Sequence, residues 1–301
     1  MTEPVLLNPS GLLESYGVEL LCAAPVALAS QDLQRRLAET LEHASRGELR
    51  LAVGAIPRSA GDATDSLTFE YHGDVRDAGE PPSWRLSATP PDQWQASTDE
   101  ALHDAIAQSW WWEEAAARAH ASPHRMLLAD HRFLTLDYQR RLVSFRNVLS
   151  AVLQCVPSRA VHWLPSQQLV DPEEIVAAHR ADPEAPLPGG LNVRFYRVDP
   201  RDTESGDEEY VMDTLGLGAL GLIDLQCHFR GLDPDAVGEV LLRTGCYLFE
   251  RGLVVRPGDS VQGPSPQDRW LARQNVALSP PEREVLELDP GYPFSAGTEE
   301  D

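Results

Sequence analysis

Apolar residues recur at helical spacing in several segments of the chain, and each of these segments opens on a residue that can cap a helix. Leu33, Leu37 and Leu41, for example, fall on one face of a helix. A serine or aspartate at the start can accept a hydrogen bond from a free backbone N–H of the first turn. These signals predict five helices, which begin at Ser30, Ser97, Asp137, Asp171 and Asp233.

Alternating or short apolar runs predict the strands between these helices. From Leu49 to Ala55, for instance, every second residue is apolar. The run 253–255 is expected to be a last strand of the core. The predicted strands are 17–24, 49–55, 67–71, 84–86, 125–129, 160–164, 191–195, 210–215, 253–255, 269–278 and 283–288.

The order of these elements predicts the fold. Strands and helices follow the order β-α-β-β-(β)-α-β, which recurs in the second half of the chain and is the order of a ferredoxin-like split βαβ sandwich. We therefore predict an α+β fold, with two ferredoxin-like sandwich units packed together and a long connecting helix. The expected parts are an N-terminal unit at 1–131, the connecting helix at 132–158 and a C-terminal unit at 159–301.

Gly216, Gly218 and Gly221 have the spacing of the dinucleotide-binding fingerprint. In that fingerprint the last glycine opens a helix, whose N-terminus binds the pyrophosphate. Here a short apolar run follows Gly221, and the next helix begins only at Asp233. We therefore expect a buried glycine-rich turn, no cofactor, and no tight binding of NAD, FAD or ATP.

The chain contains no lysine, so its 25 basic residues are all arginines. This excludes a Schiff-base nucleophile, a pyridoxal-phosphate anchor and the lysines of phosphate loops and kinases. The four cysteines form no C-x-x-C pair, and no apolar run approaches the roughly 18 residues of a membrane span. Because the N-terminus also lacks the features of a secretory signal, we expect a soluble cytoplasmic protein without membrane contact.

The formal net charge of -22 argues against direct binding of nucleic acid or an anionic membrane. It favours encounter with a basic protein, which is the partner class that we expect. Asp207, Glu208 and Glu209 end a local concentration of acidic residues and are candidate binding residues. A solvated loop is the alternative interpretation of this acidic segment.

Three side chains around the glycines are candidates for chemistry. Asp213, Asp224 and His228 could serve together as acid, base or metal ligand. The structural alternative is that Asp213 and Thr214 hydrogen-bond backbone N–H groups of the turn and that His228 lies on the outer face of a strand. Their spacing matches no metal-ligand pattern, and we expect no metal. A weaker group of possible ligands flanks the 125–129 strand: His124, Asp130 and His131.

Trp110, Trp111 and Trp112 cannot all face inward from one helix, because consecutive residues lie about 100° apart around it. One or two of them are therefore expected to be exposed or to cover a second element. Exposed tryptophans often anchor interfaces, so the three are candidate binding residues. Core packing with a partial lid is the alternative.

Several strings of the second half match the pattern of a known family. They include Leu191-Asn-Val-Arg-Phe, Met212-Asp-Thr-Leu-Gly, Asp224-Leu-Gln-Cys-His-Phe, Gly258-Asp-Ser-Val-Gln-Gly and Leu288-Asp-Pro-Gly. On these strings the chain resembles a bacterial family catalogued as domain of unknown function 4261. The resemblance implies a cytosolic bacterial α+β protein, and it implies no reaction, cofactor or catalytic residue.

Two classes of function remain. The acidity and the missing catalytic motifs favour a non-enzymatic protein-binding module with an acidic surface, such as an immunity-type or stress-linked partner binder. The alternative is an enzyme of unfamiliar type with a site around Asp213, Asp224 and His228. A flat acidic face would favour the binder, whereas a deep pocket holding these three residues would favour the enzyme.

Overall fold

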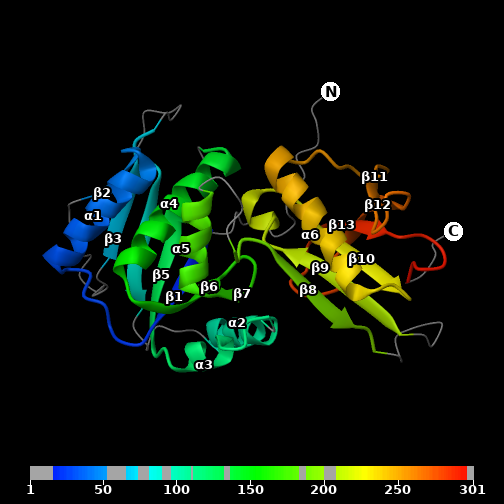
Figure 1. The fold of residues 1–301 in the computed structure, drawn as a ribbon, viewed down its shortest axis with the longest axis horizontal. Coiled ribbons are helices and arrows are strands. Elements are labelled where there is room, and N and C mark those ends of the chain that lie inside the picture. The colour runs from blue at the N-terminus through cyan, green and yellow to red at the C-terminus, as the bar shows by residue number, and fades with distance from the viewer. Residues whose placement is uncertain are drawn as a thin grey trace. The chain divides into compact units, whose positions relative to one another are not determined.

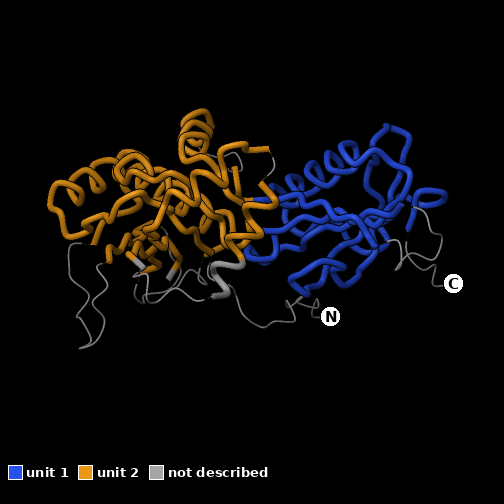
Figure 2. Tube along the Cα trace, turned by 90° about the horizontal axis from the view of Figure 1, so that it is seen from below, with its two compact units in different colours: residues 1–14, 191–301 blue, residues 15–190 orange. Residues whose placement is uncertain are grey.

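The computed structural model describes residues 16–52, 66–73, 81–89, 96–109, 111–131, 136–182, 188–199 and 208–296. The chain divides into two compact units between Gly190 and Leu191 (Figure 2). We call residues 16–190 the N-terminal unit and residues 191–296 the C-terminal unit. Within the described ranges no helix is long and apolar enough to cross a membrane.

The N-terminal unit is built on a sheet whose neighbouring strands all run antiparallel. The order of its described strands is β2-β3-β4-β5-β1-β6-β7. β1 lies inside the sheet, where Glu19 pairs with Leu127 on one side and with His162 on the other. The strands are β1 (Gly17–Cys22), β2 (Leu49–Ala52), β3 (Ser66–Tyr71), β4 (Ser83–Thr89), β5 (His124–His131), β6 (Ser158–Trp163) and β7 (Gln168–Val170).

Helices cover both faces of this sheet (Figure 1). α1 (Gln31–Ser45), α4 (Tyr138–Cys155) and α5 (Pro172–Ala181) lie on one face, and α2 (Ala96–Ala107) and α3 (Ala115–His120) on the other. Phe145 of α4 contacts the rings of Trp84 and Trp163. On the opposite face, Ala160 of β6 packs against α3. The alternation of side chains along β6 accounts for this division, because successive residues of a strand point to opposite faces.

The helix that the sequence predicts from Ser97 to near Pro123 is interrupted in the structure. α2 ends at Ala107, and α3 begins only at Ala115. Ser109 explains the interruption, because its hydroxyl donates to the carbonyl of Ala105 at 2.6 Å and accepts from the N–H of Leu169 at 3.2 Å. A serine that bonds back to the helix in this way competes with helical hydrogen bonding, and here it also ties the helix end to β7.

The C-terminal unit holds a second sheet, in the order β11-β12-β13-β10-β9-β8. Its described strand pairs are antiparallel except β10 with β13, between which the chain passes through α6 (Pro234–Arg251). The strands are β8 (Asn192–Arg197), β9 (Glu209–Leu215), β10 (Asp224–Arg230), β11 (Ser260–Gln262), β12 (Arg269–Val276) and β13 (Glu284–Asp289).

The two faces of this second sheet differ in polarity. Leu225, Cys227 and Phe229 of β10 belong to an apolar core with Val237 and Leu241 of α6. Because strand residues alternate between faces, Asp224, Gln226 and His228 lie on the face turned away from α6. This polar face carries Asp224 and His228, two of the residues predicted as candidates for chemistry.

The α+β class is confirmed, but the ferredoxin-like arrangement is not. A split βαβ unit has one strand between its first two strands, whereas three strands separate β1 from β2. The expected boundaries at 131 and 158 also differ from the observed division after Gly190. α4 packs against α1 and α5 inside the N-terminal unit, and β6 pairs with β1 in the same sheet. The hydrophobic periodicity of a segment does not show which distant strand it pairs with, so these boundaries were not predictable from it.

Residues 253–255, expected to form a strand, do not form one. Leu253 and Val254 are exposed, and Gly252 ends α6 with a φ of 79°. The neighbours of β13 in the sheet are β10 and β12, so residues 253–255 do not pair with it. The three-residue run after Gly252 is therefore part of the connection between α6 and β11.

Candidate functional site

The glycine-rich segment forms a turn whose backbone N–H groups bond a carboxylate of the same chain. Gly216 has a φ of 127° and Gly221 a φ of 77°, conformations that residues with a side chain rarely adopt. A single 3₁₀ turn, Gly218–Leu220, lies between them, and β10 follows. Gly221 thus opens no helix, as the sequence predicts.

Asp224 places its carboxylate against the backbone of the glycine turn. Its carboxylate accepts hydrogen bonds from the backbone N–H groups of Leu217 at 3.1 Å and Gly218 at 3.3 Å. The hydroxyl of Thr214 donates to the same carboxylate at 3.2 Å. An anion is already bound at these N–H groups, so the turn offers no free cradle for a pyrophosphate.

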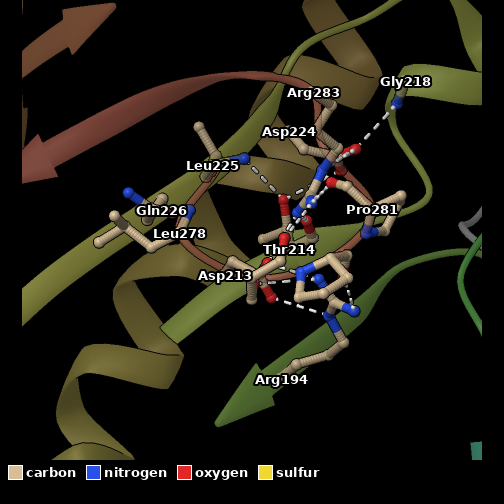
Figure 3. Close-up of polar contacts among 12 residues, drawn as sticks. Arg194, Asp213, Thr214, Gly218, Asp224, Leu225, Gln226, Leu278, Pro281 and Arg283 are labelled. Carbon is tan, nitrogen blue, oxygen red and sulfur yellow. Dashed lines mark hydrogen bonds and ion pairs between the residues drawn. The ribbon is translucent and has the colours of Figure 1, made fainter. Parts of the chain in front are cut away.

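Asp213 is fully buried, at 0% exposed. It is the centre of an ion-pair cluster (Figure 3). Arg194 donates a hydrogen bond to each of its carboxylate oxygens, from Nε at 2.9 Å and from Nη2 at 2.6 Å. Arg283 donates from Nη2 at 2.7 Å, and the hydroxyl of Ser279 donates to the same oxygen. Two guanidinium groups and a hydroxyl therefore satisfy this carboxylate.

The segment between β12 and β13 covers the cluster. Arg194 donates to the carbonyl of Pro280 at 2.8 Å, and the N–H of Leu278 donates to the side chain of Gln226 at 2.7 Å. Arg283 at the end of this segment also donates to the carbonyl of Thr214 at 3.0 Å. These contacts join β8, β9, β10 and the covering segment into one closed network (Figure 3).

The electrostatics of this network suit a structural role. Burial raises the pKa of Asp224, against the opposing effects of Arg283 and of the two backbone N–H groups that bond it. Arg283 Nε lies 3.6 Å from Asp224, so the same arginine approaches both aspartates. Carboxylates held by so many donors are poorly placed to exchange protons with a substrate.

His228 lies on the same face of the sheet but outside the cluster. Its Nε2 atom is 3.0 Å from the carboxylate of Glu209, which also lies 3.7 Å from Arg230. Glu209 is only 4% exposed because it begins β9 inside the sheet. The structure thus brings Asp213 and Asp224 together through Arg283, and it places His228 in a separate contact with Glu209.

The other candidate residues are scattered. Glu208 is exposed and pairs with Arg197 at 2.5 Å, while Asp207 and Trp110 lie outside the described residues. Trp111 is 42% exposed, and Trp112 packs against the core cluster of α2 and α3.

The weaker group of possible ligands also has a structural partner. Asp130 accepts from Arg141 at 2.7 Å and from the N–H of Tyr16 at 2.9 Å. The side chain of His131 lies outside the described residues. No group of three or more His, Cys, Asp or Glu side chains in the described part of the chain is arranged to hold a metal ion.

The C-terminal unit also contains a groove of about 760 Å³, which was not predicted from the sequence. We call it the aromatic groove. It is formed by the start of β9, the connection from β10 to α6, and a turn after β13. Glu208 and Arg230 carry its charges, and its apolar lining consists of Tyr210, Leu232, Pro234, Tyr292, Pro293 and Phe294.

Backbone hydrogen bonds hold the turn after β13 against β10. The N–H of Arg230 donates to the carbonyl of Phe294 at 2.9 Å, and Phe229 forms a β-bridge with Ser295. Tyr292 at the tip of this turn is 90% exposed. The string Gly291-Tyr-Pro-Phe294 is the sequence signal that could have located the groove, because apolar side chains that lie together on a surface can mark an interaction site.

The rings of the groove continue into the core of the unit. Tyr210 stacks on Phe195 with ring centroids 5.3 Å apart, and it lies 5.9 Å from the buried Phe229. The Tyr210 hydroxyl donates to Glu208 at 3.0 Å. The floor of the groove is thereby fixed by rigid elements, whereas Tyr292 projects from a turn.

Comparison with known proteins confirms the family resemblance. The family model of a domain of unknown function, DUF4261, matches residues 213–289. The matched segment begins at Asp213 and includes Asp224, Arg283 and the glycine turn. No curated protein and no solved structure matches the chain.

Proposed function

We propose that this chain is a protein-binding module, and that the aromatic groove binds a peptide segment of its partner. The observation that carries this proposal is Tyr292, a tyrosine that is 90% exposed in a groove also lined by Tyr210 and Phe294. Tyrosine is enriched at the energetic centres of protein interfaces, where its ring buries a large area at a small loss of side-chain entropy. Solvated exposure of such a side chain is a cost that binding would remove.

The size and build of the groove support the same proposal. A volume of about 760 Å³ lies within the range of roughly 300–1,000 Å³ that is typical of ligand sites. Its walls come from β9, α6 and a turn that is hydrogen-bonded to β10. The part of the groove on β9 and α6 is preformed, and such a surface loses little conformational entropy when it binds.

The enzyme alternative has less support. It needs a carboxylate or imidazole that a substrate can reach, but Asp213 is fully buried and bonded to Arg194, Arg283 and Ser279. Asp224 is bonded to the glycine turn, and His228 contacts Glu209 rather than either aspartate. In this proposal Asp213, Asp224 and His228 stabilise the C-terminal unit. The aromatic groove is the binding site.

Selection of peptides tests the proposal. A library of displayed random peptides is passed over the immobilised full chain, and the enriched sequences are then measured against two variants. We expect Tyr292→Ala to lose these peptides and Tyr247→Ala to keep them, because Tyr247 is also an exposed tyrosine of the C-terminal unit but does not line the groove. No enrichment, or equal binding by Tyr292→Ala, would contradict the proposal.

A further inference from the structure

The strands around the aromatic groove restrict how a peptide can bind there. β9 lies between β8 and β10, and β10 is paired with β9 on one side and with β13 and residue 295 on the other. An extended peptide that joins a sheet needs a free strand edge. The groove offers no such edge on these two strands, so its ligand must bind mainly through side chains.

The lining of the groove favours one backbone conformation for that ligand. Its apolar surfaces are mostly aromatic rings and proline rings, contributed by Tyr210, Pro234, Tyr292, Pro293 and Phe294. Aromatic-lined grooves bind polyproline II segments, which need no backbone ladder and are already extended before they bind. Proline rings in such a segment can stack on the exposed ring of Tyr292 and pack against the part of Tyr210 that lines the groove, since the Tyr210 ring already contacts Phe195 and Phe229.

Glu208 adds a preference for positive charge. Its carboxylate already receives the guanidinium of Arg197 and the hydroxyl of Tyr210. An ionised carboxylate has about four acceptor positions, so two remain for an incoming donor. Arginine fits best, because its planar group can bond the carboxylate and stack on a neighbouring tyrosine at the same time. Arg230 does not compete for Glu208, since it donates to the carbonyl of Pro293 and faces Glu209.

The charge of the whole chain acts in the same direction. A net charge of -22 attracts a positively charged segment before contact and repels an acidic one.

We infer that the ligand of the aromatic groove is a proline-rich segment that carries an arginine and binds in the polyproline II conformation. This inference rests on the proposed function of the groove, and it names the chemistry of the partner. Tyr292 stacks on a proline, Tyr210 lines the site, and Glu208 receives the arginine.

Three synthetic peptides of equal length test the inference by fluorescence anisotropy with the full chain. The first contains prolines and arginines, the second has glutamate in place of each arginine, and the third keeps the arginines but has glycine and serine in place of the prolines. We expect only the first to bind well. Tyr292→Ala should weaken it at least about tenfold, and Tyr247→Ala should leave it unchanged.

Glu208→Gln tests the arginine contact. It should weaken the first peptide several-fold, because it removes an acceptor and leaves Arg197 unpaired beside the incoming charge. The matched control is Glu282→Gln, which changes an exposed acid outside the groove. Equal weakening by both variants would overturn the role of Glu208, since it would show only a general effect of charge.

The outcomes separate this inference from the proposed function. Equally tight, Tyr292-dependent binding of the glycine–serine peptide would overturn the polyproline preference and leave the groove as a peptide site. The same result with the glutamate peptide would overturn the preference for arginine. If none of the three binds while the random library yields Tyr292-dependent sequences, the inference is wrong and the proposed function stands. If the library also yields none, both fail.

Discussion

Asp213 illustrates how much of the C-terminal unit depends on a single side chain. Its carboxylate neutralises Arg194 and Arg283, which are themselves only 2% and 7% exposed. Removing one member of a buried ion pair leaves the others without compensation, which costs more than the pair itself contributes. The cluster also joins β8, β9 and the segment before β13, so its loss should affect the whole unit.

We therefore expect Asp213→Asn to lower the free energy of unfolding of the C-terminal unit by about 3–5 kcal/mol. Hydrogen exchange of the slowest amides in β9 and β10 measures this unit separately from the other. The exposed Glu282→Gln is the control and should change stability by less than about 0.5 kcal/mol. A loss below about 1 kcal/mol in Asp213→Asn would show that the cluster does not hold the unit together.

The glycines of the turn differ in what they require. Gly216 has a φ of 127°, which a residue with a Cβ adopts only under strain. Gly218 has no such φ, and an added Cβ would lie 3.3 Å from a carboxylate oxygen of Asp224.

Gly216→Ala should consequently destabilise the C-terminal unit by about 1–3 kcal/mol, and Gly218→Ala by less. The same amides of β9 and β10 give both values, and each variant serves as the control for the other. Equal effects of the two substitutions would show that backbone conformation is not the reason for glycine at 216.

Four of the five expected helix starts were correct, because caps are local, whereas Ser97 lies inside α2, which begins at Ala96. Ser30, Asp137, Asp171 and Asp233 each accept a hydrogen bond from the first turn of the helix that they were expected to begin. The partners of Asp213 were not predictable in this way. Arg194 and Arg283 lie 19 and 70 residues away from it, and their meeting depends on which strands become neighbours.

At the scale of elements, the packing of α5 against α4 contains a buried histidine. Burial lowers the pKa of His179, and the positive charge of Arg146 acts in the same direction. The folded state therefore binds a proton less readily than the unfolded state. The free energy of unfolding should fall as pH decreases through about 6.5, the ordinary pKa of histidine, and level off below the folded pKa.

His179→Gln should reduce this acid-induced loss of stability. Urea unfolding followed by hydrogen exchange of amides in β1 and β6, at about pH 7.5 and pH 5, measures it in the N-terminal unit. The control is His43→Gln, which changes an exposed histidine in the last turn of α1. The interpretation fails if the two variants lose equal stability on acidification.

Element order was harder to predict than element type. The strand at 125–129 was expected from its apolar run, but nothing in that run indicates that β5 pairs with β1 and β4. β10 was not among the predicted strands, although apolar and polar residues alternate along Asp224–Arg230 as they do in strands that were predicted. The groove was missed because its walls come from segments up to 86 positions apart in the sequence, from Glu208 to Phe294.

For the whole molecule, the excess of acidic residues should appear in the kinetics of association. The Debye length shrinks from about 14 Å to about 4 Å between roughly 50 and 500 mM salt. The association rate of an arginine-containing peptide should therefore fall steeply over that range, while its dissociation rate changes less. Stopped-flow anisotropy measures both rates, and a salt-independent association rate would show that the net charge of -22 does not guide binding.

The footprint of a bound peptide distinguishes the groove from the buried cluster most directly. The full chain is saturated with a peptide enriched by the selection, and hydrogen exchange is compared with and without it. We predict added protection at residues 208–210, 230–234 and 291–296, which form the aromatic groove. Protection confined to the segments 213–226 and 278–283, around Asp213 and Asp224, would place binding at the cluster and contradict the assignment of function to the groove.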